Sequence, residues 1–429
     1  MYQGETSAAL LKGHIKLPGS RLGWTNVGTT VVLLGTTSLL TDISSEMVST
    51  TLPLYLLLTL RLSPLQVGLT DGIYQSAGVL VRVISGIVAD RWRQPKQVAA
   101  VGYGLSAICK LGFLTAGSNW AALSGVIFLD RIGKGIRTAP RDAMIAAGSE
   151  PGQLATAFGV HRAMDTAGAM LGPLLAVAIL SVVGQGYDAI FVVSFCVALI
   201  GVALIVLFVD NPKDQAVGRS ADSLTTMSSA TPSAVSLRRM SALLCQSEFR
   251  TLIIVSGALA LVTVSDGLLY LALQERMTIQ IGMFPLLYVV TALAFMALAI
   301  PAGWLADRVG HETVFVLGYG LLAGAYVMLL LPWMNYFVAV LMLIALGSYY
   351  AATDGVLMAL ASRMLPADLR ATGLALLTTG TGLARLLASA LYGTVWGWYG
   401  AERALTVFVL GLVAVLWLAR RTILRVETN

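Results

Sequence analysis

Charged side chains are scarce in this chain of 429 residues. Asp, Glu, Lys and Arg together make up 12% of it, whereas soluble globular proteins carry roughly 25%. Hydrophobic residues make up 57%, and the mean hydropathy is +0.81. The composition argues against a soluble fold. The net charge is +6, and the positively charged residues lie between apolar runs. This arrangement is typical of membrane proteins, so we expect a lipid bilayer as partner and no nucleic acid.

Motifs of enzymes and metalloproteins are also missing. The sequence contains no P-loop, no zinc-ligand spacing and no nucleophile elbow, which are the short patterns that carry such chemistry. Its three cysteines cannot all pair, and two of them lie in apolar runs, so no disulfide framework is expected. We therefore expect neither an enzyme nor a bound cofactor.

Apolar runs long enough to cross a membrane as helices recur along the chain. They fall in two sets of six, at about 27–60, 65–89, 97–117, 119–143, 154–182 and 187–209, and at about 249–274, 282–306, 312–332, 335–361, 370–396 and 403–421. The sequence predicts an all-α integral membrane protein with two related six-helix bundles. The expected segments are a cytosolic start at 1–24, bundles at 25–209 and 248–422, a cytosolic linker at 210–247 and a tail at 423–429.

Basic residues between the apolar runs predict the orientation. With both termini in the cytosol, the inner loops hold most of the Lys and Arg residues, Lys134, Arg137 and Arg141 among them. Such an excess marks the cytosolic side. We expect a multi-pass protein of the bacterial inner membrane.

Several features recur in the two halves. Gly86-Ile-Val-Ala-Asp90-Arg91 is repeated as Gly303-Trp-Leu-Ala-Asp307-Arg308. Acidic residues recur as well, because Asp42 and Asp130 of the first half match Asp266 and Asp354 of the second. An internal duplication of this kind places a substrate site near the middle of the membrane.

These motifs resemble those of the major facilitator superfamily. The repeated Gly-x-x-x-Asp-Arg resembles its signature loop, and Arg131-Ile-Gly-Lys134-Gly135 resembles its buried-arginine motif. The pattern Gly159, Gly168, Gly172 and Pro173 is similar to the antiporter motif of proton-coupled exporters, although Ala176 and Val177 replace its final glycines. The resemblance implies a monomeric twelve-helix transporter, with the Gly-x-x-x-Asp-Arg copies as latches of the inward gate.

Ionisable residues inside the apolar runs are the candidate site residues. Each costs roughly 2.5–3.5 kcal/mol at the centre of a membrane helix, so we expect each to serve a purpose. The proton-coupling candidates are Asp42, Glu46, Asp130, Arg131, His161 and Asp165. Asp42 and Glu46 stand four residues apart on one helix face. They form a proton site, a structural pair, or a cation site; for a metal ion, the set is Asp42, Glu46, Met47 and His161.

Arginines beside these acids allow further interpretations. Asp165 either neutralises Arg162, or protonation of Asp165 or His161 releases Arg162 to bind substrate. Asp130 and Arg131 point about 100° apart on a helix, so we expect them to have different partners. The substrate-binding candidates are Lys110, Arg162, Asp266, Asp354 and Arg385. Of these, Lys110 and Arg385 either bind an anionic group or pair with acids.

Three functions are compatible with this pattern. The leading one is a proton-coupled exporter of a drug, siderophore or metabolite. The second is an importer or uniporter of a small anion or a metal ion such as iron. The third is a receptor or scaffold with a degenerate transporter fold, which has little reason to keep charges inside its helices.

Overall fold

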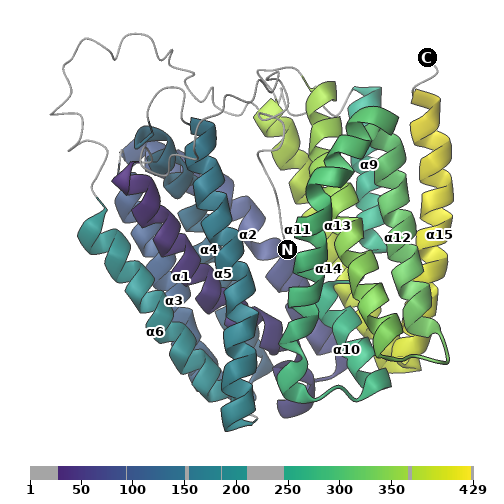
Figure 1. The fold of residues 1–429 in the computed structure, drawn as a ribbon, viewed down its shortest axis with the longest axis horizontal. Helices are drawn as coiled ribbons and strands as arrows, with labels where there is room; N and C mark the ends of the chain where they lie inside the picture. The colour runs from purple at the N-terminus through teal and green to yellow at the C-terminus, as the bar shows by residue number, and fades with distance from the viewer. Residues whose placement is uncertain are drawn as a thin grey trace. The chain divides into compact units, whose positions relative to one another are not determined.

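The computed structural model is entirely helical in the part of the chain that it describes (Figure 1). It describes residues 28–92, 94–149, 154–184, 186–209, 246–365 and 370–426, without the side chains of 79–80, 82–92, 154–155, 370–372 and 421–426. The predicted segment at 1–24 lies outside these residues, as does the linker at 210–247 apart from 246–247. The predicted tail at 423–429 is helical as far as Val426, where α15 ends.

The first half contains six helices. They are α1 (Thr29–Leu54), α2 (Pro64–Trp92), α3 (Pro95–Ala116), α4 (Trp120–Ala147), α5 (Leu154–Val183) and α6 (Tyr187–Phe208). Pro53 lies near the end of α1, and the chain continues there as a π-helical turn, Tyr55–Thr59. Proline lacks the amide donor of a regular helix, so a change of hydrogen-bonding pattern near it is expected.

The second half also spans the membrane six times. Its helices are α9 (Ser247–Leu261), α10 (Asp266–Met277), α11 (Pro285–Val309), α12 (His311–Leu330), α13 (Tyr336–Met364), α14 (Arg370–Tyr399) and α15 (Ala401–Val426), with α9 and α10 together forming one span. The predicted all-α membrane fold with twelve spans is confirmed. Within the described residues, ten spans are long and apolar enough to cross a membrane by length and composition. Helix α4 is not among them, since it carries Asp130, Arg131, Lys134, Arg137 and Arg141.

The sequence had suggested one continuous helix for the seventh apolar run, but the structure divides this run into two helices. The chain leaves the helix after Leu261 and enters α10 at Asp266, where the Ser265 hydroxyl accepts a hydrogen bond from the amide of Leu268 at 3.4 Å. The Val264 amide in this break donates to the Tyr326 hydroxyl of α12 at 2.7 Å. Irregular backbone at membrane depth is tolerated where protein groups satisfy it or where it lines a cavity.

The helices form two compact units. One contains, among the described residues, 29–51, the part of α2 from Ala77 onward and α3 to α6. The other contains Leu52–Ser76 together with the helices from α9 to α15. The unit boundary therefore passes through α1 and α2, whereas the predicted bundles divide the chain at the linker.

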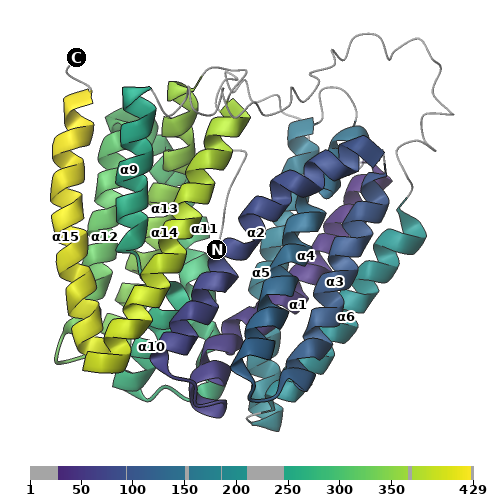
Figure 2. The same cartoon turned by 180° about the vertical axis from the view of Figure 1, so that it is seen from behind.

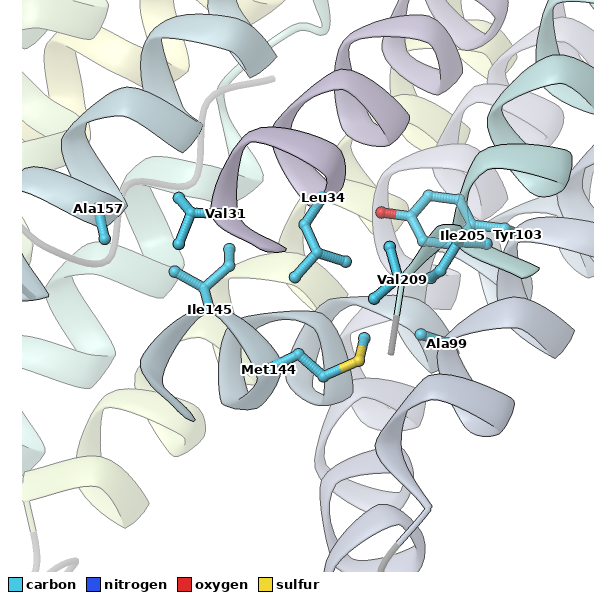
Figure 3. Packing of buried hydrophobic residues seen from close by; sticks show 9 residues of the cluster. All are labelled: Val31, Leu34, Ala99, Tyr103, Met144, Ile145, Ala157, Ile205 and Val209. Atoms are coloured by element: carbon cyan, nitrogen blue, oxygen red, sulfur yellow. The ribbon is translucent and has the colours of Figure 1, made fainter. Parts of the chain in front are cut away.

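Each unit has its own apolar core. In the first unit, Val31 and Leu34 of α1 pack with Tyr103 of α3, Met144 of α4 and Ile205 of α6 (Figure 3). In the second unit, α9 and α11 to α15 run roughly parallel (Figure 2). A cluster around Phe249, Leu252, Leu360 and Leu377 joins α9, α13 and α14.

Large apolar side chains also cover the outside of both units. Val182, Ile300, Phe337 and Leu410 are each more than 60% exposed. Exposed apolar surface on this scale marks a membrane-facing protein.

Two glycines of the antiporter-like motif set the distance between α5 and α1. A Cβ atom on Gly172 would lie 2.7 Å from the Cβ of Glu46 and 2.8 Å from the Ile43 carbonyl oxygen. One on Gly168 would lie 3.2 Å from the Cβ of Asp42. Small residues allow helix backbones to approach closely in membranes. Gly159, in contrast, has no neighbouring atom within 4 Å of such a position.

Gly172→Ala is expected to destabilise the protein by about 1–3 kcal/mol, because the added methyl group overlaps α1. Gly159→Ala is the matched control, since its methyl group enters open space and alanine favours the helix. Thermal unfolding of the purified protein in detergent measures both. Equal unfolding temperatures for the two variants would contradict the close contact.

Candidate functional site

Helix α4 places a row of basic side chains inside the first unit. Lys134, Arg137 and Arg141 follow at spacings of three and four residues, which aligns them along one face of the helix. The sequence had assigned them to a cytosolic loop, and this assignment is wrong: α4 continues to Ala147, and Arg137 is only 3% exposed. The spacing of the three residues was the signal available in the sequence.

Asp130 binds two cations in the interior of this unit. Lys110 of α3 donates to its Oδ1 at 2.9 Å, and Arg131 Nε donates to its Oδ2 at 3.1 Å. Lys110 is 1% exposed, so the ion pair is dry. The expectation of different partners for Asp130 and Arg131 is wrong, because the long arginine side chain turns back onto its neighbour. Of the two interpretations of Lys110, the structure shows pairing with an acid.

Asp42 of α1 faces the basic row of α4. Its Oδ1 lies 3.4 Å from Arg137 Nη2 and 4.0 Å from Lys134 Nζ. The Arg137 guanidinium lies over the ring of Tyr103, 4.6 Å from its centre, a position that favours a cation. The other terminal nitrogen of Arg137, Nη1, is buried and has no partner among the described residues.

Asp165 of α5 contacts a different cation from the one predicted. Its Oδ2 lies 3.8 Å from Arg141 Nη1 and 3.7 Å from His161 Nδ1. Arg162 is exposed and makes no ion pair within 4.0 Å in the described part of the chain. Arg141, which lies one turn beyond Arg137, therefore takes the place beside Asp165 that the sequence had offered to Arg162.

Ser38 connects His161 and Arg141 to α3. The Ser38 hydroxyl lies 3.1 Å from His161 Nε2, 3.2 Å from Arg141 Nη1 and 3.1 Å from the Tyr103 hydroxyl. Nothing in the sequence singled out Ser38 or Tyr103, since a serine and a tyrosine in apolar runs are common. Together these contacts bring α1, α3, α4 and α5 to one polar centre.

Glu46 has a separate environment. Ser49 donates to its Oε2 at 2.7 Å within α1. Asp42, Glu46 and His161 thus have different partners, and no three His, Cys, Asp or Glu side chains of the described residues group as a metal site. The alternative metal set with Met47 is not brought together.

The second unit contains acids that have hydroxyl partners instead of cations. The Tyr350 hydroxyl donates to Asp266 Oδ1 at 2.6 Å, and the Ser389 hydroxyl donates to Asp71 Oδ2 at 2.7 Å. The sequence had singled out Asp71 as an ionisable residue inside an apolar run but had assigned it no role.

Asp354 and Arg385 form no ion pair within 4.0 Å among the described residues. Arg385 interacts electrostatically with Asp354 and Asp266 from a longer distance. Its Nε is buried and has no hydrogen-bond partner in the described part of the chain.

Of the two Gly-x-x-x-Asp-Arg copies, the second has its side chains within the described part of the chain. The first, with Gly86, Asp90 and Arg91, lies in α2 where side chains are outside the described set. In the second, Arg308 lies over the Trp304 ring at 3.6 Å, and Asp307 lies 3.5 Å from His311.

A side chain at Gly303 would meet no atom within 4 Å. Gly303 is therefore not needed for a close approach between helices. The latch role of both copies stays a prediction.

Lys110→Met is expected to destabilise the protein by about 3 kcal/mol, because it removes one partner of a buried ion pair. Asp130→Asn should destabilise the protein as well, because it takes the shared acid away from both Lys110 and Arg131. Lys134→Met, at a side chain that is 40% exposed, is the control. Thermal unfolding in detergent measures the series, and a Lys110→Met variant as stable as the control would refute the pairing.

Comparisons with known proteins agree with this architecture. The family model described as Major Facilitator Superfamily matches residues 34–389 and 255–428. An uncharacterized MFS-type transporter of Methanocaldococcus jannaschii, MJ1317, is 32% identical over 376 residues, which cover 85% of this chain and 88% of that protein. A 158-residue stretch is 33% identical to the uncharacterized protein Rv2265 of Mycobacterium tuberculosis, covering 37% of this chain and 38% of that protein.

Solved structures share the fold at low sequence identity. The nucleoside transporter NupG superposes with a TM-score of 0.72 and 18% identity, covering 92% of this chain and 98% of that one. A peptide transporter POT in complex with sulfate gives a TM-score of 0.71 and 14% identity, covering 93% and 96%.

Proposed function

Because the chain belongs to the major facilitator superfamily, we propose that it couples transport of its substrate to protons bound by Asp42 and Asp165. The chain is an integral multi-pass membrane protein and a secondary transporter of a small molecule; it is not an enzyme. We further propose that it exports its substrate from the cytosol of a bacterium and that both termini lie in the cytosol.

The proposal rests on the contacts that two carboxylates make with arginines of α4. Asp42 on α1 and Asp165 on α5 each contact a cation of the same helix, Arg137 and Arg141, at 3.4 and 3.8 Å. Protonation of either carboxylate removes its attraction for that arginine. The two contacts hold α1 and α5 to α4, so a change in their charge alters the packing of these helices.

The position of the antiporter-like motif supports export. Gly168 and Gly172 lie against the turns of α1 that carry Asp42 and Glu46. The glycines thus place the proposed proton sites directly at the α1–α5 contact. A movement of these helices and a change of protonation would then occur at one interface.

Asp42→Asn and Asp165→Asn are each expected to reduce substrate-driven proton movement at least tenfold, because an amide does not take up a proton. The assay follows a pH dye inside proteoliposomes while nucleosides, dipeptides and organic cations are offered from one side. Nucleosides and dipeptides are included because the transporters NupG and POT share the fold. Asp188→Asn, at an exposed site in the first turn of α6, is the control.

Two results would overturn the coupling proposal. Undiminished proton movement in both variants would remove Asp42 and Asp165 from the coupling. Substrate flux without any proton movement in the unaltered protein would favour a uniporter.

A further inference from the structure

Because the chain is duplicated, the acids inside the helices of its two halves can be compared. Asp42 and Asp130 of the first unit match Asp266 and Asp354 of the second by position in the repeat. In the first unit both acids contact cations. In the described part of the second unit neither has a Lys, Arg or His nitrogen within 4.0 Å.

The sequence explains the difference. Counted from the matching acids Asp130 and Asp354, the residues Arg131, Lys134 and Arg137 of α4 correspond to Gly355, Met358 and Ala361 of α13. Helix α3 supplies Lys110, whereas α12 contains neither Lys nor Arg. The second unit has kept the acids and lacks the cations that neutralise them in the first.

The surroundings of these two acids are aromatic. Asp354 lies four residues after Tyr350 on α13, so the two share one helix face, and Tyr350 donates to Asp266. The rings of Tyr349 and Tyr350 are 4.9 Å apart, and that of Tyr319 lies 5.2 Å from Tyr349. Tyrosine faces attract organic cations, most strongly where water is excluded.

Arg385 is the described cation that acts on both acids, from beyond ion-pair distance. A third acid lies close by, because Asp71 Oδ1 is 3.7 Å from the position that a Cβ atom on Gly267 would take, next to Asp266. The acids of this group therefore outnumber Arg385. Charge without a counter-ion is costly in a membrane, so an additional positive charge would stabilise the ionised acids.

The break between α9 and α10 lies at the same place. Asp266 is the first residue of α10 and is 9% exposed. Its neighbour Val264 is held through Tyr326 of α12. Interrupted helices in transporters carry substrate and ion sites, because the interruption brings polar groups to the middle of the membrane.

We propose that Asp266 and Asp354 bind the positively charged group of an organic cation, with Tyr349 and Tyr350 contributing their rings. The substrate thus supplies the charge that Lys110 and the α4 basic residues supply in the first unit. The inference rests on the transporter function proposed above and names the chemical class of its substrate.

The test measures binding to the full-length protein in detergent without a pH gradient, so it does not depend on proton coupling. The probes are tetraphenylphosphonium, tetraphenylborate, which has a similar shape and the opposite charge, and the smaller cation phenyltrimethylammonium. Isothermal titration calorimetry should detect at least one of the two cations and show weaker or no binding of the borate. Substrate flux without proton movement in the unaltered protein, together with intact cation binding, would refute the coupling proposal alone.

Asp266→Asn and Asp354→Asn should each weaken cation binding about tenfold, equivalent to roughly 1.4 kcal/mol. Asp188→Asn should leave it unchanged. Asp354 accepts no side-chain hydrogen bond from the described residues, so Asp354→Asn breaks none of these bonds. This variant therefore still tests the proposal if Asp266→Asn, which alters the contact with Tyr350, fails to fold. Arg385→Gln should retain or strengthen cation binding, because it removes a repelling charge.

Three results would overturn the proposal. The first is the absence of binding for both cations at pH 7. The second is equal affinity of the unaltered protein and both Asn variants. The third is that the unaltered protein binds the borate more tightly than the cations and that Arg385→Gln abolishes this binding. That result would indicate an anion-binding site.

Discussion

A carboxylate enclosed by membrane helices needs a positive charge or several hydroxyl groups, and the first unit meets this need from α4. Arg131, Arg137 and Arg141 each contact an acid, and those acids stand on α4 itself, α1 and α5. The ion pairs therefore also decide which helices lie beside one another. Loosening one of them changes a contact between helices, and under the coupling proposal protonation acts through this link.

The two halves have used the same duplicated positions differently. In the first, the acids contact cations of the protein itself. In the second, Asp266 has a tyrosine hydroxyl as partner and Asp354 has no ion pair among the described residues. Under the two proposals, one half responds to protons and the other recognises the solute.

The fold followed from the sequence because runs of about 20 apolar residues have few alternatives to a membrane-spanning helix. The identities of the buried acids also followed, since each is costly in lipid. Their partners did not. Arg137 and Arg141 were counted as loop residues because long basic side chains near a run end usually reach the surface. The Asp130–Arg131 contact depended on a side-chain rotamer, and the break before Asp266 depended on Tyr326 of a later helix.

The interrupted seventh span has a consequence for biosynthesis. α9 has 15 residues and α10 has 12, lengths of about 22 and 18 Å at 1.5 Å per residue. Neither crosses a hydrocarbon layer of about 30 Å alone, so the pair must enter the bilayer together with Asp266 between them. Tyr326 and Tyr350, which later satisfy this break, are synthesised after it. The nascent segment must therefore be sheltered from lipid, by the translocation machinery or by earlier helices, until α12 and α13 have emerged.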